Sequence, residues 1–351
     1  MMQNREEKTK QYTDNKTIGA AVAKTIKIFG KAKIPNPEQE AKWLFCNLLN
    51  VNLANLILKL QSSITAAIKT KLEHYIKLRI KNIPLAYIIK EASFYGYTFE
   101  VSNDTLIPRL DSETIIEEIK LIAKQSKSKL TLLERKQNRN IINIVDLGCG
   151  TGCLSNVATL ELIKMNYKVK NVLLVDISKK ALVVAKNNAK ILLQQHNVNV
   201  QFANQDFTKP QTANLLNNFC KNNKRQKNQE EQNAKYIIIC NPPYLTSEQM
   251  QNIDNCVKKE PELALFGGKN GMYCYSNIIN WIPILKQLPH GKNFTNIVFE
   301  IDPELKYNIV NELKQKNLTQ IRISKDQENR DRVISCKIDT FASFNINKSS
   351  G

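Results

Sequence analysis

The sequence predicts an α/β fold: a mostly parallel sheet of seven strands, covered by helices on both faces, with a small all-α bundle ahead of it. The sheet is predicted because apolar runs of strand length alternate with helical patterns from residue 141 onward. Repeated β-helix-β units form parallel sheets of this kind. The bundle is predicted because residues 17–90 carry only helical patterns.

Composition sets the broad class of protein. The chain has 351 residues, 42% of them hydrophobic, which is enough for a sizeable core and two domains. No apolar run approaches the roughly 18 residues of a membrane span, and the start of the chain is too polar for a signal peptide, so we expect a cytoplasmic protein. The eight scattered cysteines are then reduced, and the three histidines stand at no zinc spacing, so no metal site is expected.

The net charge of +19 raises the question of nucleic-acid binding. Only nine of the 51 basic residues are arginine, the residue whose planar fork suits phosphates and bases. The lysines also come with many asparagines and isoleucines. We therefore interpret the charge as a compositional bias first, and expect no specific nucleic-acid partner.

A helical domain is predicted over residues 17–90, after a polar N-terminus (1–16) that we expect to be disordered. Its clearest helix starts after Asn36, a suitable N-cap. Pro37 fits the first turn, and Gln39 stands where a capping box needs its reciprocal side chain. These residues predict a helix that is capped by side chains at its start.

A hairpin and the α/β domain follow. The apolar period changes to two around Gly96, which predicts a β-hairpin in a linker over 91–106. The α/β domain is expected over 107–340, opening with a helix that runs to about Ile122. Two polar insertions and a C-terminal tail are expected at about 124–140, 221–234 and 341–351. The predicted strands are 141–147, 171–176, 199–205, 235–240 and 296–301, with two weaker ones near 320–324 and 333–338.

The first predicted strand runs into a glycine-rich turn that is typical of cofactor sites. Gly148, Gly150 and Gly152 let the backbone bend tightly against a ligand, and the following helix presents free amide hydrogens. The spacing differs from the Gly-x-Gly-x-x-Gly pyrophosphate fingerprint. An acid at the strand end, Asp146, suits the ammonium group of S-adenosylmethionine and would repel a diphosphate.

Acids at the next two strand ends extend this prediction. Asp176 lies 24 residues past Gly152 and can accept both ribose hydroxyls, although NAD would use such an acid too. Asp206 can accept the adenine amine while Phe207 packs on the ring; taken alone, Asp206 is more simply a turn residue. Together these features favour S-adenosylmethionine as the cofactor. The residues predicted to hold it are Asp146, Gly148, Cys149, Gly150, Thr151, Gly152, Asp176, Asp206, Phe207 and Asn241.

The fourth predicted strand stops at Asn241-Pro242-Pro243-Tyr244, because two prolines cannot extend a ladder. Open α/β sheets bind their ligands at such carboxyl ends. The Asn241 side-chain oxygen and the Pro242 carbonyl can hold both hydrogens of a planar amide or amine and turn its lone pair toward a methyl donor, while Tyr244 can stack on it. Charge on the donor sulfur is dispersed during transfer, so no strong base is needed beforehand. Asn241, Pro242 and Tyr244 are the predicted catalytic residues, and all four residues are predicted to bind substrate.

Longer blocks of sequence resemble the HemK/PrmC family, which methylates a glutamine side chain in peptide chain release factors. The resemblance runs from about Thr17 to Asp339. Beyond the glycine turn and the tetrapeptide, it rests on Pro84-Leu85-Ala86-Tyr87-Ile88, Phe94-Tyr95-Gly96, Ile107-Pro108-Arg109 with Glu113, Glu260-Pro261, Ala264-Leu265-Phe266-Gly267-Gly268 with Gly271, Glu300-Ile301 and Arg330-Asp331-Arg332-Val333. Leu110, where proline is usual, and Asp302-Pro303, where glycine is frequent, depart from the pattern.

The resemblance implies a class I S-adenosylmethionine-dependent methyltransferase, Rossmann-like, with a seven-stranded sheet. It implies transfer to the side-chain nitrogen (N5) of the glutamine in a Gly-Gly-Gln motif, with S-adenosylhomocysteine as product. The helical domain would contact the protein substrate, and a monomer is expected. Two other functions stay open. The tetrapeptide and the charge are shared with DNA or RNA adenine N6-methyltransferases, although the chain offers no separate base-recognition domain. A scaffold that binds cofactor without catalysis is less favoured, because Asn241 and Tyr244 are intact.

Overall fold

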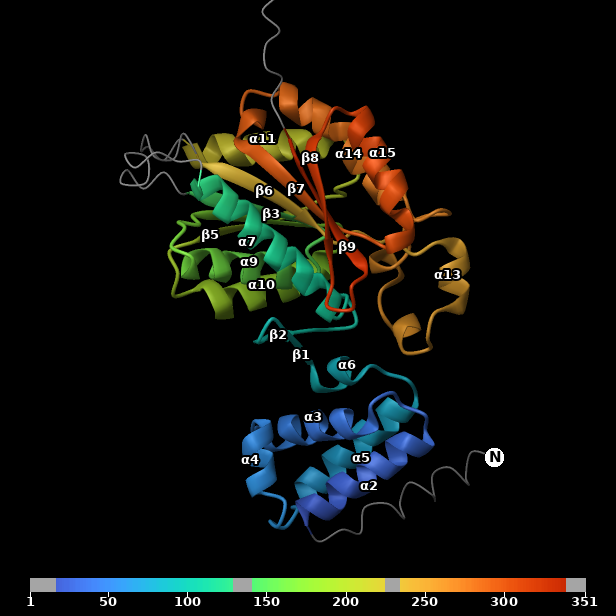
Figure 1. Ribbon diagram of the computed structural model, residues 1–351. Helices are drawn as coiled ribbons and strands as arrows, with labels where there is room; N and C mark the ends of the chain where they lie inside the picture. The colour runs from blue at the N-terminus through green and yellow to red at the C-terminus, as the bar shows by residue number, and fades with distance from the viewer. Residues whose placement is uncertain (1–16, 129–140, 225–233, 339–351) are drawn as a thin grey trace, which may run out of the picture. The chain divides into compact units, whose positions relative to one another are not determined.

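The computed structural model describes residues 17–128, 141–224 and 234–338 (Figure 1). It divides into two compact units: the first comprises residues up to 91 together with 254–259, and the second comprises 92–253 and the chain from 260 onward. Within the described ranges, no helix is long and apolar enough to cross a bilayer. The polar N-terminus, most of both insertions and the tail lie outside the described residues.

The first unit is a bundle of helices, as the sequence predicts. Its helices are α2 (Ile18–Lys31), α3 (Pro37–Leu49), α4 (Leu53–Leu58), α5 (Ala66–Ile80) and α6 (Leu85–Ile89). Buried apolar side chains from these helices, among them Phe29, Leu44 and Phe45, form one core. A partly buried ion pair joins α3 to α5, because Arg79 Nε lies 2.5 Å from Glu40 Oε2.

The predicted capping box at the start of α3 is wrong. Asn36 adopts a left-handed conformation, with φ of 47°, and its side chain makes no cap hydrogen bond. An N-cap side chain reaches the amides of the first turn from an extended backbone, which Asn36 does not have. A complete capping box forms instead at α13 (Ser247–Asn252), where Thr246 and Gln249 bond reciprocally just after the Asn-Pro-Pro-Tyr tetrapeptide.

The second unit contains the predicted seven-stranded sheet. Its strands are β3 (Ile142–Leu147), β4 (Asn171–Asp176), β5 (Asn199–Asn204), β6 (Lys235–Cys240), β7 (Phe294–Glu300), β8 (Thr319–Lys325) and β9 (Asp331–Lys337). Their order is β5-β4-β3-β6-β7-β9-β8. The first five in that order are mutually parallel, and β9 runs antiparallel to both its neighbours. The prediction of a mostly parallel sheet is confirmed.

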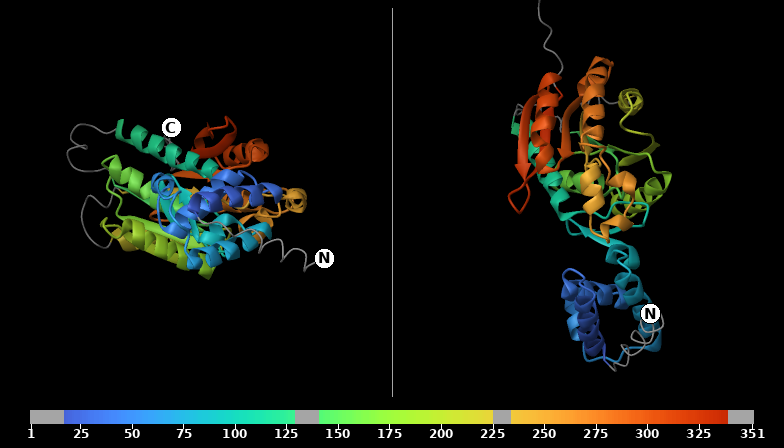
Figure 2. Two further views of the ribbon diagram at one scale, coloured as in Figure 1. Left: turned by 90° about the horizontal axis from the view of Figure 1, so that it is seen from below. Right: turned by 90° about the vertical axis from the view of Figure 1, so that its right-hand side faces the viewer.

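Helices cover both faces of this sheet. On one face, α7 (Glu113–Ser128), α9 (Cys153–Lys164) and α10 (Lys179–Leu193) lie side by side (Figure 2, left). The other face carries α11 (Gln211–Lys224), α14 (Tyr273–Gln287) and α15 (Lys306–Gln315) (Figure 1). Successive residues of a strand point to opposite faces of the sheet, so that Ile144 packs with the first set of helices and Val145 with the second.

A two-stranded hairpin, β1 (Glu91–Phe94) and β2 (Tyr97–Glu100), precedes the sheet and confirms the pattern read around Gly96. Its turn residues Tyr95 and Gly96 both have positive φ, 52° and 78°, as a two-residue hairpin turn of the primed type requires. The Tyr95 amide donates to Glu113 Oε1 at 2.7 Å, which fixes the hairpin to the start of α7. That helix continues to Ser128, beyond the predicted end near Ile122.

Candidate active site

The predicted site residues gather at one edge of the sheet. Because β3, β4, β5, β6 and β7 are parallel, their carboxyl ends share this edge. Leu147 pairs with Cys240, and Cys240 pairs with Phe299, so the turn after β3, the tetrapeptide after β6 and the end of β7 are neighbours. This is the position at which α/β sheets bind ligands.

The glycine turn has a conformation that only glycine adopts readily. Gly148, Gly150 and Gly152 have φ of 73°, 51° and 74°. A Cβ on Gly148 would lie 2.9 Å from the Phe207 ring, and one on Gly152 would lie 2.9 Å from Leu174 Cδ2. The turn therefore needs glycine both for its backbone and for close packing against β4 and against the residue after β5. Gly152 directly precedes α9, whose first amides face this turn.

Asp146 is fully buried beneath the glycine turn. One carboxylate oxygen, Oδ2, accepts from the Ser155 amide at 3.2 Å, while Oδ1 has no hydrogen-bond partner among the described residues. Burial raises the pKa of Asp146 to about 7; the Ser155 side chain and amide oppose this shift, and the nearby charge of Asp176 adds to it. An unpartnered buried carboxylate oxygen fits a positively charged ligand group, such as the ammonium of S-adenosylmethionine.

Asp176 bridges the glycine turn and the start of α10. Its Oδ2 accepts from the Gly150 amide at 2.9 Å, and its Oδ1 accepts from the Ser178 amide at 2.8 Å. Burial raises its pKa, and these amide hydrogen bonds oppose the shift. Each carboxylate oxygen has a second lone pair, so these bonds leave acceptor capacity for ribose hydroxyls.

Asp206 and Phe207 stand after β5. Asp206 Oδ1 accepts from the Thr208 amide at 3.0 Å and from its hydroxyl at 2.6 Å, so this carboxylate organises the local turn. Phe207 is buried against the glycine turn, and its carbonyl accepts from the Trp281 indole at 3.0 Å. The role of Asp206 toward adenine stays a prediction. Cys149 and Thr151, also predicted to hold cofactor, are buried within the turn.

The segment 265–271 packs against the backbone of the Asn241-Pro242-Pro243-Tyr244 corner. The Leu245 amide donates to the Leu265 carbonyl, and the Gly267 amide donates to the Leu245 carbonyl, both at 2.9 Å. A Cβ on Gly267 would lie 2.6 Å from Tyr244 Cα, and one on Gly271 would lie 2.5 Å from the Tyr244 carbonyl oxygen. The close approach explains why glycines stand in this block, a role that the sequence patterns did not reveal.

The Asn241 carboxamide has a defined orientation. Its Nδ2 donates to Ser112 Oγ at 3.2 Å, whereas Oδ1 accepts no hydrogen bond from the described part of the chain. The oxygen is therefore free to accept a hydrogen from a substrate amide. Tyr244 is partly buried against the core beside α14, and burial raises the pKa of its hydroxyl, so the ring is neutral at physiological pH.

Glu260 links this corner to the segment before α7. Its Oε1 lies 2.5 Å from Arg109 Nη2, and its Oε2 accepts from the Ile107 amide at 3.1 Å. Two blocks that are far apart in the sequence, Ile107-Pro108-Arg109 and Glu260-Pro261, thus meet at a single carboxylate.

Comparison with known proteins decides the family. A model of the PrmC N-terminal domain matches residues 20–89, and a methyltransferase domain model matches 139–263. A release factor glutamine methyltransferase of Mycoplasma mycoides is 33% identical over 249 residues, which is 71% of this chain and 74% of that protein. The chain belongs to the release factor glutamine methyltransferase family. The Staphylococcus aureus protein of that name is 29% identical, over 86% of this chain and 92% of that protein. The Leptospira interrogans protein is 28% identical, over 91% of this chain and 97% of that protein.

Proposed function

We propose that this member of the family transfers a methyl group from S-adenosylmethionine to the side-chain nitrogen (N5) of the glutamine in the Gly-Gly-Gln motif of peptide chain release factors. The observation that carries the proposal is the Asn241 Oδ1, which accepts no hydrogen bond from the described residues and lies at the end of β6, beside a glycine turn suited to the cofactor. Family membership supports the choice of acceptor.

The residues at the carboxyl edge of the sheet fit the cofactor. Bound there, S-adenosylmethionine supplies a methyl group on a positively charged sulfur. We assign its ammonium to the open Oδ1 of Asp146 and its ribose hydroxyls to Asp176, with Phe207 beside the glycine turn as an apolar wall. A cation at Asp146 favours the ionised carboxylate and so lowers its raised pKa. We also assign to the cofactor site Asp206, Cys149, Thr151 and Asn241.

An amide nitrogen is a weak nucleophile because its lone pair is delocalised into the carbonyl. Asn241 Oδ1 and the Pro242 carbonyl accept the two N–H hydrogens of the glutamine side chain, which aims the nitrogen at the methyl group. Tyr244 stacks on the planar amide and, being neutral, does not compete as a nucleophile. The proton that becomes acidic leaves after transfer. Pro243 keeps the backbone extended between these contacts.

The proposal includes the remaining expectations for the chain. The helical domain, residues 17–90, binds the release factor, the linker 91–106 joins it to the methyltransferase domain 107–340, and the enzyme acts as a cytoplasmic monomer without a specific nucleic-acid partner. Sedimentation velocity tests the oligomeric state, and gel shift with duplex and single-stranded oligonucleotides tests the last point.

Incubation with labelled S-adenosylmethionine and a release factor tests the central claim. We expect label on the release factor, and none when the Gly-Gly-Gln glutamine is replaced by glutamate. Label that persists on that variant contradicts the assigned acceptor, and label on adenine-containing oligonucleotides but not on release factor favours a nucleic-acid methyltransferase.

Replacement of the gripping side chain tests the assigned site. Asn241→Ala removes an acceptor that aligns the nitrogen, so we expect kcat to fall by about a hundredfold or more. Calorimetry should show that cofactor affinity changes far less, because Asp146 and Asp176 are untouched. Equal loss of transfer and cofactor binding would assign Asn241 mainly to the cofactor.

A further inference from the structure

The two ends of the Asn241 carboxamide have opposite chemistry, and only one of them suits the reaction. Its oxygen accepts hydrogens, as a glutamine N–H requires, whereas its NH₂ group donates and would repel that N–H. A rotation of about 180° about the last side-chain bond exchanges the two ends without changing the shape of the residue. Something in the protein must hold the oxygen outward.

Ser112 is the group that distinguishes the two ends. It lies in η1 (Leu110–Ser112), just before α7, is 3% exposed, and accepts from Asn241 Nδ2 at 3.2 Å. A hydroxyl has one hydrogen, so it serves as acceptor or as donor toward Asn241 according to where that hydrogen points. If the hydrogen points to another acceptor, the Asn241 nitrogen turns inward to Ser112 and its oxygen faces the substrate.

Glu300 is positioned to be that other acceptor. It ends β7, one residue beyond Phe299, which pairs with Cys240, so Glu300 lies beside Asn241 at the sheet edge. The Ser112 hydroxyl lies close enough to the Glu300 carboxylate to lower its pKa and so favour the ionised form. The carboxylate is 1% exposed, and its Oε2 has no partner among the described residues. An ionised carboxylate only accepts, so it draws the Ser112 hydrogen toward itself.

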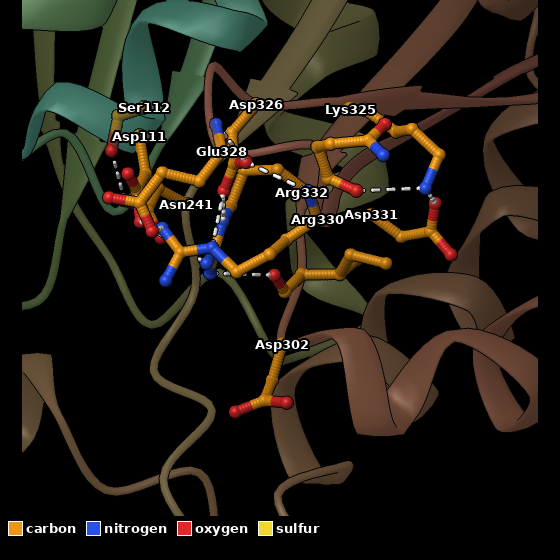
Figure 3. Close-up of polar contacts among 12 residues, drawn as sticks. Asp111, Ser112, Asn241, Asp302, Lys325, Asp326, Glu328, Arg330, Asp331 and Arg332 are labelled. Atoms are coloured by element: carbon orange, nitrogen blue, oxygen red, sulfur yellow. Dashed lines mark hydrogen bonds and ion pairs between the residues drawn. The ribbon is translucent and has the colours of Figure 1, made fainter.

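Ion pairs hold η1 in register with Asn241. Asp111, the neighbour of Ser112, forms ion pairs through its Oδ2 with Arg330 Nη2 at 3.0 Å and with Arg332 Nη2 at 3.1 Å (Figure 3). Arg332 also donates from Nη1 to the Ile301 carbonyl at 3.2 Å, directly after Glu300. The Arg330-Asp331-Arg332 block thus fixes the segment that carries Ser112 to the end of β7.

We propose that Ser112 and Glu300 are positioning residues that keep the Asn241 oxygen toward the substrate nitrogen. The order of donation runs from Asn241 Nδ2 to Ser112 Oγ and from the Ser112 hydroxyl to the Glu300 carboxylate. This inference rests on the proposed function and adds two residues to it, neither of which contacts the glutamine.

Protonation of Glu300 reverses the order. A protonated carboxyl can donate to Ser112, whose own hydrogen then points to Asn241 and favours the flipped carboxamide. Burial raises the pKa of Glu300 to about 7; Ser112, Arg332 and Arg109 oppose this, and Asp111 adds to it. The other ionisable groups near it are the tyrosine hydroxyls of Tyr244 and Tyr275 and the thiols of Cys240 and Cys153, all with a raised pKa and so neutral below pH 7. We therefore expect kcat to fall as the pH drops below about 7.

Steady-state methylation of release factor, at saturating cofactor, tests the proposal. Wild-type turnover is the reference, and its absence would refute the proposed function and not this inference. For Ser112→Ala we expect about a tenfold lower kcat with an unchanged cofactor affinity, since one orienting hydrogen bond is lost. Ser112→Thr keeps the hydroxyl and should restore most of kcat. Equal kcat values for Ser112→Ala and wild type, or equal losses in Ser112→Ala and Ser112→Thr, would overturn the assignment.

The pH profile of kcat in Glu300→Gln separates a positioning role of Glu300 from a purely structural one. The amide side chain does not titrate, so the fall in kcat below about pH 7 should disappear from the profile, whatever the absolute rate. Persistence of that limb in Glu300→Gln with unchanged midpoint would show that another group controls it and would overturn the role of Glu300. Thermal unfolding of each variant confirms that the chain tested is folded.

Discussion

Gly267→Ala is expected to lower kcat because its added methyl group displaces the neighbouring backbone of the Asn-Pro-Pro-Tyr tetrapeptide. The alanine Cβ would lie 2.6 Å from Tyr244 Cα and 2.7 Å from the Pro243 carbonyl oxygen. Both are backbone atoms, so no change of rotamer relieves the overlap. The shorter contact must open by about 0.8 Å to reach 3.4 Å, where ordinary van der Waals contact begins. The chain on the other side of this contact is the Asn-Pro-Pro-Tyr tetrapeptide, which we propose binds the substrate.

A displacement of about 1 Å in groups that align reactants costs on the order of a hundredfold in rate. We therefore expect kcat for glutamine methylation to fall by roughly ten- to a hundredfold in Gly267→Ala. Cofactor affinity, measured by calorimetry, should stay within about threefold, because the glycine turn after β3 is not part of the contact. Gly30→Ala in α2 is the control for an added methyl group, since a Cβ there meets nothing within 4 Å. Both variants are assayed at saturating release factor, because the helical domain is proposed to bind it. Wild-type kcat in Gly267→Ala would refute the claim that residues 260–271 set the position of Tyr244.

Three further outcomes follow from buried groups of the α/β unit. The folded-state pKa of Asp146 is raised to about 7, so its contribution to stability is present below about pH 4 and is lost as the pH rises through 7. In urea unfolding, the free energy of unfolding of Asp146→Asn should therefore fall less between pH 5 and pH 8 than that of wild type. An equal fall in both proteins would contradict the burial effect. Gly152→Ala should lower the Tm more than Gly150→Ala, because both have positive φ but only Gly152 would also overlap Leu174; equal Tm values would refute the packing argument. Glu118 accepts from Arg322, Ser324 and Ser335 while 2% exposed, so Glu118→Ala should cost about 3 kcal/mol in the free energy of unfolding, with a smaller cost in Glu118→Gln.

The strand pattern of the sequence was sufficient to predict the sheet. Buried parallel strands need continuous branched apolar runs, and the Tyr236–Cys240 run stops at two prolines, so the end of β6 could be read directly. The glycine turn and Asp146 were predictable for the same reason, since glycines and an acid at a strand end are local features. The start of α3 after Asn36, with Pro37 in its first turn, was predictable as well. The missing side-chain cap was not, because asparagine suits both an extended and a left-handed N-cap, and the way the chain enters the helix decides between them.

Sequence alone therefore determined the layered α/β class, the glycine turn and the Asn-Pro-Pro-Tyr corner, because each depends on residue types within one short segment. Only the tertiary structure decided what surrounds that corner. Ser112, Glu300 and Gly267 come from three distant segments, and serine, glutamate or glycine at such positions has many ordinary roles. They meet because parallel strands bring their carboxyl ends to one edge and because Asp111, bound by Arg330 and Arg332, holds Ser112 within hydrogen-bonding distance of Asn241.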